Sequence, residues 1–549
     1  MSTVQAPKKP MNVLWIMADQ LRWDYLSCYG HPHLSTPHID GLAARGLRFT
    51  NAYVQSPLCG PSRMSSYTGR YCHSHGATWN GFPLRVGEPT LGDHLRKQGV
   101  RSVLIGKTHM TVDAEGMEWL GIDRTTEIGV RISECGFEPF ERDDGLHPPE
   151  YEPHPRYNDH LRDNGIGGEY PWQDHANAGL DDDGKRLSGW LLKYSNLPAD
   201  IPEELSETPY MTGRAMEFMS EAGDAPWLCH LSFIKPHWPY IVPAPYHDMF
   251  GPHDIIPPVR SDAEHATDHP VFKAFLESRI CRTFARDEVR ERVIPAYMGL
   301  IKQIDDQMGR LFAFMEERGL FENTMIVFTS DHGDYLGDHW MGEKDLFHDP
   351  SVKVPLIVYD PREAADVTRG SVCDKLVEAI DLAPTFQSYF GGAPLPHILE
   401  GRDLTPLLHD ATGTTPWRRY AISEYDYAVK EARAILGNDQ NDARLIMIRD
   451  ERYKYVHAEG FRPMLFDLQE DPDELDDLGG VSGDPTLDAV KQRLSDAIFE
   501  WARRHHCRIT MPPETVDART AKEPEGILIG VWDEADYEQA YGRPFRHGR

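Results

Sequence analysis

The chain has 549 residues and a formal net charge of -30 at pH 7, with 87 acidic against 57 basic side chains. A chain of this length exceeds one ordinary core, so one large domain and a smaller one are expected. The acidic balance disfavours nucleic acid and anionic membranes as partners. An anionic substrate must therefore be held by local positive charge or by a metal ion.

Eight cysteines are dispersed at positions 28, 59, 72, 135, 229, 281, 373 and 507, without a CxxC pair. This pattern is poor for a disulfide framework and poor for a zinc site. The polar residues 1–10 lead into only a short apolar run, which ends at Asp19, so neither a signal peptide nor a membrane span is predicted. We therefore expect a reduced, cytoplasmic protein.

Short apolar runs that stop at polar residues predict buried strands. Helices are expected between them, and strands alternating with helices indicate an α/β fold with a large mixed, mostly parallel sheet sandwiched by helices. The predicted strands are residues 11–18, 47–54, 100–105, 227–233, 324–330 and 354–359, and the predicted helices are 39–46, 91–98, 212–221, 287–318 and 379–390.

The pattern changes beyond about residue 416, where short antiparallel strands are expected at 444–448, 453–457 and 464–468, with a helix at 485–504. We therefore predict a catalytic α/β domain over 1–415, a small antiparallel α+β subdomain over 416–504, and a tail over 505–549. The tail is apolar enough to pack on the body or on a neighbouring subunit, which favours a homodimer or homotetramer. Irregular stretches at 110–210 and 238–285 are expected to shape the substrate entrance.

The segment Cys59-Gly60-Pro61-Ser62-Arg63 is predicted to open a helix. Pro61 suits the first helical position, and Ser62 can satisfy the free N–H groups of the first turn. Cys59 would then lie just ahead of a helix N-terminus, where the dipole and unpaired N–H groups favour an anion. Such a position lowers the pKa of a thiol and suits an anionic ester equally well.

Two pairs of polar side chains follow predicted strands, Asp19 with Gln20 and Asp331 with His332. Ligand sites of open α/β sheets gather at the carboxyl ends of their strands. Two carboxylates, an amide oxygen and an imidazole can surround an oxygen-preferring divalent cation. The set suits Ca²⁺ or Mn²⁺, and the imidazole slightly favours Mn²⁺. Taken alone, each pair also fits an ordinary turn or helix cap.

Four further side chains are candidates for holding an anion. Lys107 and His109 alternate after a predicted strand, and both would face one pocket if the chain stays extended. His237 is held between prolines that restrict the backbone. Lys344 is close enough in sequence to reach back to Asp331. A solvated surface role is the alternative for each of them.

These motifs, in this order, resemble those of the type I sulfatases of the alkaline phosphatase superfamily, over most of residues 11–470. The resemblance implies an alkaline-phosphatase-like fold and metal-dependent hydrolysis of aryl or alkyl sulfate esters. It also implies that a formylglycine-generating enzyme oxidises Cys59 to formylglycine, whose hydrated aldehyde is the nucleophile steadied by Arg63. By the same resemblance, Asp19, Gln20, Asp331 and His332 are the metal ligands, and Lys107, His109, His237 and Lys344 line the sulfate pocket.

The implied mechanism uses a recyclable aldehyde. One hydroxyl of the hydrate attacks the sulfur of the ester, and His237 with Lys344 protonates or stabilises the departing oxygen. His109 then takes a proton from the remaining hydroxyl, which expels sulfate.

The motifs leave the substrate open. Gln20 and His332 stand where sulfatases often carry Asp and Asn, and with Asn80 they resemble the phosphonate monoester and phosphodiester hydrolases of the superfamily. Lys107 and His109 are sulfatase-like. A sulfatase is favoured, phosphonate monoester or phosphodiester hydrolysis on the same scaffold is the rival, and an inactive metal- and anion-binding protein is the third reading.

Overall fold

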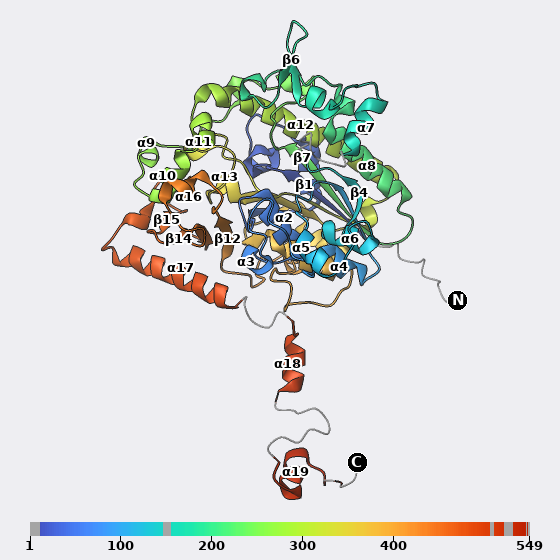
Figure 1. Cartoon of the computed structure of the whole chain (residues 1–549), viewed down its shortest axis with the longest axis vertical. Helices are drawn as coiled ribbons and strands as arrows, with labels where there is room; N and C mark the ends of the chain where they lie inside the picture. Colours follow the sequence, from blue (N-terminus) through green and yellow to red (C-terminus); the bar gives the residue numbers. More distant parts are fainter. Residues whose placement is uncertain (1–10, 146–154, 505–509, 521–530, 545, 547–549) are drawn as a thin grey trace.

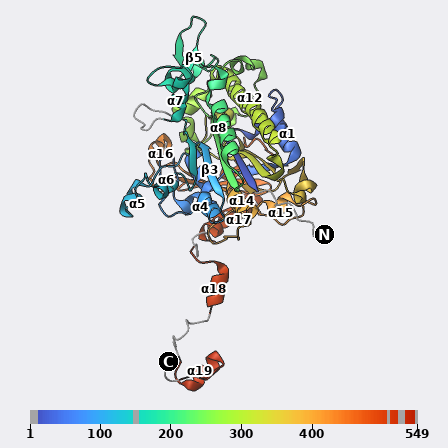
Figure 2. The same cartoon turned by 90° about the vertical axis from the view of Figure 1, so that its right-hand side faces the viewer.

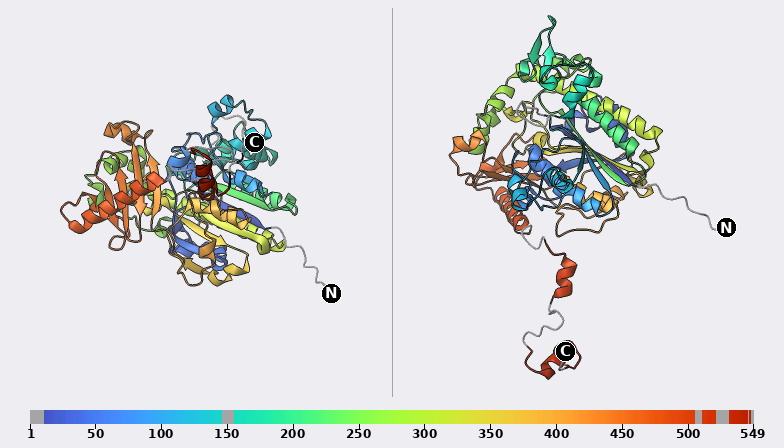
Figure 3. Two further views of the ribbon diagram at one scale, coloured as in Figure 1. Left: turned by 90° about the horizontal axis from the view of Figure 1, so that it is seen from below. Right: turned by 45° about the vertical axis from the view of Figure 1, so that its right-hand side comes forward.

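The computed structural model describes residues 11–145, 155–504, 510–520, 531–544 and 546. Residues 1–10, which bear on the predicted lack of a signal peptide, and Cys507 lie outside the described residues. A large sheet with helices on both faces forms the body, and a smaller antiparallel sheet lies at its side (Figures 1 and 3). The predicted fold class is confirmed.

The main sheet has nine strands within the described residues. Its spatial order is β10 (Ser371–Cys373), β2 (Leu47–Tyr53), β9 (Lys353–Tyr359), β8 (Thr324–Ser330), β1 (Asn12–Asp19), β7 (Trp227–Pro236), β3 (Arg101–Gly106) and β4 (Glu138–Arg142), with β11 (Val377–Glu378) also paired to β2. From β8 to β4 neighbouring strands run parallel. In contrast, β9 runs antiparallel to both β8 and β2.

The helices appear largely where the apolar periodicity predicts them. The longest is amphipathic and spans nearly the predicted 287–318. The described α-helices are α1 (Pro37–Arg45), α2 (Cys59–Thr68), α3 (Cys72–His75), α4 (Leu91–Arg96), α5 (Ala114–Trp119), α6 (Glu127–Ser133), α7 (Arg156–Asp163), α8 (Glu207–Glu221), α9 (Asp262–His265), α10 (Pro270–Leu276), α11 (Arg279–Phe284), α12 (Asp287–Glu317), α13 (Asp349–Val352), α14 (Leu382–Tyr389), α15 (Thr405–Leu408), α16 (Glu431–Leu436), α17 (Pro485–Arg504), α18 (Pro513–Arg519) and α19 (Glu534–Tyr541).

Both faces of the sheet are buried, which explains why β1 reads as a continuous apolar run rather than an alternating one. Trp15 packs on one face in a cluster that includes residues of α2, α4 and α14. Ile16 packs on the opposite face in a cluster that includes residues of α1, α8 and α12. Figure 2 shows α1, α8 and α12 above the sheet and α4 and α14 below it. The functional side chains are therefore confined to the strand ends.

The smaller sheet consists of β12 (Ala421–Asp426), β13 (Arg444–Arg449), β14 (Tyr453–Ala458) and β15 (Met464–Asp467), all antiparallel. The last three strands and α17 lie where the sequence predicts them, whereas β12 was not predicted. Helix α17 packs on this sheet, and its Trp501 meets Tyr71 of the body edge to face at 5.0 Å. Figure 3 shows the small sheet and α17 beside the body.

Two other expectations concern less regular parts of the chain. The predicted irregular stretch 110–210 is not simply irregular, because it contains α5, α6, β4, α7, the hairpin of β5 (Ala178–Leu180) and β6 (Arg186–Ser188), and the start of α8. Helices α18 and α19 of the tail project away from the body in Figure 1. Packing of the tail against a neighbouring subunit stays a prediction.

The described residues contain no helix with the length and apolar character that a membrane crossing demands. The described cysteines are all free thiols, in keeping with the dispersed pattern in the sequence.

Candidate active site

Four adjacent parallel strands bring the predicted site residues to one edge of the sheet. Strand β1 ends at Asp19, and the carboxyl ends of β8, β7 and β3 lie beside it. Because these ends share an edge, side chains that follow them converge. The residues delivered there are Asp19 and Gln20 after β1, Asp331 and His332 after β8, His237 after β7, and Lys107 and His109 after β3.

Helix α2 begins two residues earlier than predicted. Cys59 is the first helical residue, Leu58 is the N-cap, and Ser62 N donates to Leu58 O at 3.0 Å to close the first turn. Pro61 is therefore the third helical residue. The Ser62 hydroxyl does not cap the helix, because it donates to the backbone oxygen of Asp331 at 2.6 Å. Cys59 lies in the first turn rather than ahead of it, where the helix dipole still favours an anion.

The sulfur of Cys59 lies at the centre of the convergent side chains. It is 3.0 Å from Nε2 of His332, 3.0 Å from Nζ of Lys344 and 3.7 Å from Oδ1 of Asp19. Burial alone would raise the pKa of the thiol, but the charges of Lys344, Lys107 and His332 bring it well below its ordinary value. The surrounding cations therefore favour the thiolate form of the unmodified side chain.

The same sulfur belongs to a buried group of potential metal ligands. One ligand atom from each of Asp19, Cys59, Asp331 and His332 lies within 4.8 Å of the others. Nδ1 of His332 is hydrogen-bonded to the backbone oxygen of Gly333 at 2.8 Å, which leaves Nε2 directed to the group. Carboxylates with one imidazole fit an oxygen-preferring divalent cation, so the donor set fits the metal that the motifs imply.

Arg63 holds the two carboxylates from the protein side. Its Nε donates to Oδ2 of Asp331 at 2.7 Å, and its Nη2 donates to Oδ2 of Asp19 at 3.2 Å. Nη1 donates to the hydroxyl of Ser232 at 2.7 Å and to the backbone oxygen of Lys107 at 2.8 Å. The ammonium of Lys107 lies 2.5 Å from Oδ2 of Asp19. Neither basic side chain bonds Oδ1 of Asp19, whereas Oδ1 of Asp331 accepts the backbone N–H groups of Gln20 at 3.0 Å and His332 at 3.1 Å.

Gln20 is fixed in one orientation. Its Nε2 donates to Oδ2 of Asp334 at 2.5 Å and to the hydroxyl of Tyr240 at 3.1 Å, while its Oε1 accepts from Nζ of Lys344 at 3.0 Å. The amide oxygen therefore faces the site. Asp334 and Tyr240 were not predicted as site residues. Each lies three positions after a predicted site residue, Asp334 after Asp331 and Tyr240 after His237, but the sequence has no separate signal for this role.

The two candidate proton-transfer groups both reach Cys59. His237 lies close enough to Cys59 for the sulfur to raise the pKa of the imidazole, and its Nδ1 donates to the backbone oxygen of Trp238 at 2.7 Å. Burial lowers the pKa of His237 to about 4, against the opposing charge of Asp19. His109 lies close enough to Cys59 to lower the pKa of its thiol. Its backbone is left-handed, with φ 55°, so the chain after β3 is not extended there as the sequence suggested.

Asn80 lies against the first turn of α2. Its Oδ1 accepts from the backbone N–H of Gly60 at 2.8 Å. A Cβ at position 60 would meet the same oxygen at 2.8 Å, so the close approach requires glycine. Asn80 thus adjoins the Cys59 turn, and its contact with substrate stays a prediction.

The segment 331–352, between β8 and β9, carries Asp331, His332 and Lys344. Its backbone is strained, because left-handed φ values are unfavourable for residues with a Cβ and persist only where the surroundings impose them. Lys344 lies between two such residues. The non-glycine residues with positive φ here are Leu336 (49°), His339 (53°), Trp340 (58°), Glu343 (56°) and Asp345 (122°).

A second buried group, His339, His348 and Glu264, supports this segment. Nδ1 of His339 lies 2.5 Å from Oε1 of Glu264, and the two imidazole rings stack at 3.9 Å with an interplanar angle of 16°. In-plane lone pairs of nearly parallel rings do not converge on one ion. The group is therefore better suited to fixing the segment than to holding a metal.

The fold and the convergent side chains define a sulfatase, and the chain belongs to that family: the family model "Sulfatase" matches residues 11–392. A second model, "N-sulphoglucosamine sulphohydrolase, C-terminal", matches residues 337–504. The resemblance drawn from the sequence motifs is confirmed.

Among individual relatives, "Multifunctional alkaline phosphatase superfamily protein PehA" of Trinickia caryophylli is 32% identical over 524 residues, covering 90% of this chain and 95% of that protein. "Arylsulfatase" of Clostridium perfringens is 28% identical over 476 residues, covering 85% and 90%. Among solved structures, "Phosphonate monoester hydrolase SpPMH from Silicibacter pomeroyi" has 30% identity and a TM-score of 0.76, covering 90% of this chain and 96% of that chain.

Proposed function

We propose that this protein hydrolyses sulfate esters, aryl or alkyl, with formylglycine derived from Cys59 as the nucleophile. The observation that carries the proposal is the position of the Cys59 sulfur, which belongs to the same buried group as the ligand atoms of Asp19, Asp331 and His332. A nucleophile generated at that side chain adjoins the metal site without any rearrangement of the backbone.

Asp19, Gln20, Asp331 and His332 would hold one divalent ion, Ca²⁺ or Mn²⁺. When bound, that ion supplies positive charge that holds an ester oxygen and lowers the pKa of the attacking hydroxyl. Lys344 adds a second cation. Against the opposing effect of burial, its pKa is raised by the Cys59 thiolate before conversion and by Asp19 and Glu343, which remain after conversion. The positive charge inside the site thus attracts an anionic substrate more strongly than the acidic surface of the protein repels it.

The first half of the reaction transfers the sulfuryl group. One hydroxyl of the hydrated aldehyde attacks sulfur, the bond from sulfur to the alcohol oxygen breaks, and the departing oxygen takes a proton. His237 is the donor, because its Nδ1 is occupied by Trp238 and its Nε2 is left to carry that proton. Binding of an anionic ester beside His237 favours the protonated imidazole, which burial otherwise disfavours. Lys344 stabilises the charge on the departing oxygen.

The second half restores the aldehyde. His109 takes the proton from the remaining hydroxyl, the carbonyl reforms, and the bond from that carbon to the sulfate oxygen breaks. Sulfate leaves, and water adds to the aldehyde to give the hydrate again. The chain thus returns to its starting state with one water consumed per ester.

A phosphonate monoester hydrolase is the second candidate. Gln20, His332 and Asn80 favour it, as does a 30% identical solved structure that carries this activity in its title. A sulfate monoester and a phosphonate monoester both carry one negative charge on a tetrahedral centre, so the same cations suit both. Lys107 and His109, which match the sulfatase motifs, are the reason that sulfate ester hydrolysis is ranked above phosphonate hydrolysis.

Protein from a host that makes formylglycine should hydrolyse 4-nitrophenyl sulfate, and Cys59→Ala should lose nearly all of that activity. The matched control is Cys373→Ala, a half-buried thiol in β10, which should keep it. The peptide containing residue 59 should be about 18 Da lighter than the unmodified peptide, because the CH₂–SH group becomes an aldehyde.

Turnover by Cys59→Ala equal to that of the parent would contradict the proposal. A higher kcat/KM for phenylphosphonate esters than for sulfate esters would put the second candidate first. An unmodified, inactive thiol in such a host would favour a metal- and anion-binding role.

A further inference from the structure

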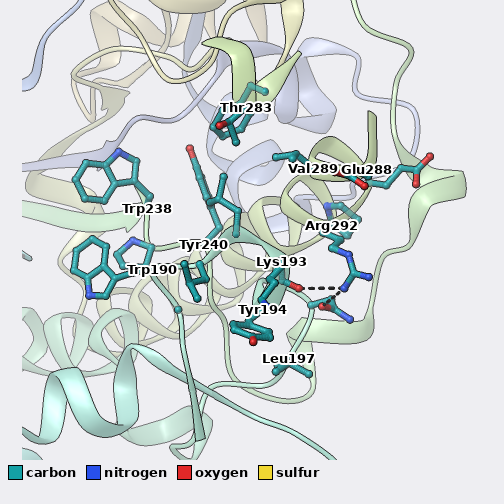
Figure 4. Close-up of a pocket in the computed structure, with 18 of the residues that line it drawn as sticks. Trp190, Lys193, Tyr194, Leu197, Trp238, Tyr240, Thr283, Glu288, Val289 and Arg292 are labelled. Atoms are coloured by element: carbon teal, nitrogen blue, oxygen red, sulfur yellow. Dashed lines mark hydrogen bonds between the residues drawn. The ribbon is translucent and has the colours of Figure 1, made fainter. Parts of the chain in front are cut away.

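A large hollow adjoins the candidate active site. Its volume is about 1560 Å³, and most of its wall comes from three stretches that are distant in sequence: residues 187–197, 238–240 and 279–295. Figure 4 shows side chains from all three around one space. The second stretch directly follows His237, and the third comprises α11 and the start of α12.

One side of the hollow is aromatic. The rings of Trp190 and Trp238 lie together there, with centroids 5.7 Å apart at 60° (Figure 4). Nε1 of Trp190 donates to Oε1 of Gln173 at 2.9 Å, which holds the ring in place. Yet Trp190 is 42% exposed and its neighbour Leu191 is 53% exposed. Uncovered apolar surface beside a site indicates a surface for a ligand.

Three residues of the wall connect the hollow to the catalytic groups. The ring of Trp238 is 4.3 Å from the ring of His237. The hydroxyl of Tyr240 donates to Asp334 at 2.7 Å, beside the Gln20 amide. Glu343 directly precedes Lys344 in the chain. The hollow therefore begins on the side of the site where His237 and Lys344 lie.

Two of the guanidinium groups in the wall are already paired. Nη1 of Arg292 donates to the backbone oxygen of Lys193 and to Oδ1 of Asn196, each at 3.1 Å, as the dashed lines in Figure 4 mark. Nη1 of Arg286 donates to Oε1 of Glu288 at 3.1 Å. Because these guanidinium groups already have partners, the aromatic faces are the main recognition surface.

We propose that this hollow binds the alcohol portion of the ester and selects neutral, extended aromatic leaving groups. The inference rests on the proposed function, because that function puts the departing oxygen beside His237 and Lys344. A second ring beyond the one attached to the departing oxygen would lie along Trp238 and reach Trp190.

The test compares biphenyl-4-yl and phenyl sulfates, or the corresponding phenylphosphonates if those are the esters hydrolysed. The two phenols have nearly equal acidity, so the ratio of kcat/KM reports binding of the second ring rather than chemistry. Trp190→Ala should lower this ratio about tenfold, mainly through KM, as expected for loss of one aromatic contact and its buried area. Trp190→Phe should keep most of it, and Trp119→Ala, which removes a 77% exposed tryptophan from α5, should leave it unchanged.

A second measurement needs no turnover. Calorimetric titration of Cys59→Ala with biphenyl-4-ol should give saturable binding that the added Trp190→Ala change weakens about tenfold. An unchanged ratio and unchanged binding would overturn the inference while the proposed function stands. Loss of binding in the double variant, with no ester hydrolysed by the parent, would support the hollow as an aryl site and overturn the proposed function.

Discussion

Asp334 holds the side-chain amide of Gln20 with its oxygen toward the metal site. Oδ2 of Asp334 accepts from Gln20 Nε2 at 2.5 Å, and an ionised carboxylate can only accept. The other end of the amide is thereby left to face Lys344. The identity of the atom that Gln20 presents to the candidate metal site thus depends on a residue outside the group of candidate ligands.

Replacing Asp334 with Asn should weaken metal binding, because a carboxamide at 334 accepts or donates and no longer dictates the orientation of Gln20. The affinity of metal-stripped protein for Mn²⁺, measured by calorimetric titration, should fall about 10–100-fold. Tyr240→Phe is the matched control, since it removes a neighbouring hydroxyl but keeps the carboxylate, and should change the affinity less. Equal affinities in Asp334→Asn and the parent would show that the amide needs no such restraint.

Replacing His237 with Ala should slow hydrolysis most for esters of weakly acidic alcohols, because those leaving groups depend most on a proton. For such esters kcat/KM should fall about 10²–10⁴-fold, and for 4-nitrophenyl sulfate much less. A series of substituted phenyl sulfates measures this as a steeper dependence of rate on phenol acidity. His253→Ala, at an exposed histidine, should leave the dependence unchanged. A uniform loss across the series would argue for a binding role of His237 instead.

Replacing Arg63 with Ala should destabilise the metal-free protein, because Asp19 and Asp331 would remain buried without their shared cation. The free energy of unfolding in denaturant should fall by about 3–5 kcal/mol. The control is Arg101→Ala, which breaks an exposed ion pair with Glu138 and should cost about 1 kcal/mol or less. If Arg63→Ala lost no more unfolding free energy than Arg101→Ala, Lys107 alone would be enough to stabilise the buried carboxylates.

The body and the small sheet should separate more readily as the pH rises. His73 of α3 pairs with Glu424 of β12 at 3.1 Å, and although burial lowers the pKa of His73, Glu424 raises it to a net value above the ordinary one. A raised folded-state pKa gives stability that is complete below the ordinary value and lost as pH rises through the folded value. Unfolding followed from pH 6 to pH 9 should show a loss of about 1 kcal/mol.

His73→Gln should abolish that pH dependence, and His253→Gln should retain it. A slope that persists in His73→Gln would assign the pH dependence to other groups.

Much of the site could be predicted because its residues follow apolar runs that stop abruptly at polar side chains. Asp19 and Asp331 are of this kind, and the strands that carry them are adjacent in the sheet. The predicted start of α2 was wrong by two residues. The prediction used Ser62 as a cap, but its hydroxyl donates to the backbone oxygen of Asp331, 269 positions away, and not to its own helix turn. Strand β12 was not predicted because Ser423 and Glu424 interrupt its apolar pattern and are covered by tertiary partners.

The placement of Lys344 could not be predicted by local preference. It depends on left-handed backbone at residues that carry a Cβ, such as Trp340 and Glu343, which composition does not reveal. The contact between Trp190 and Trp238 likewise could not be predicted from the sequence, because the two residues are 48 positions apart and meet only in the folded chain.

The reversed direction of β9 has a consequence for the segment that joins it to β8. A parallel neighbour of β8 would require a crossover that carries the chain away over one face, whereas an antiparallel neighbour lets it return along the same rim. Residues 331–352 are therefore one closed excursion, anchored at both ends, that contributes carboxylate, imidazole and ammonium together. Its geometry is also set from outside, because Glu264 of α9 pairs with His339 and Gln20 after β1 accepts from Lys344.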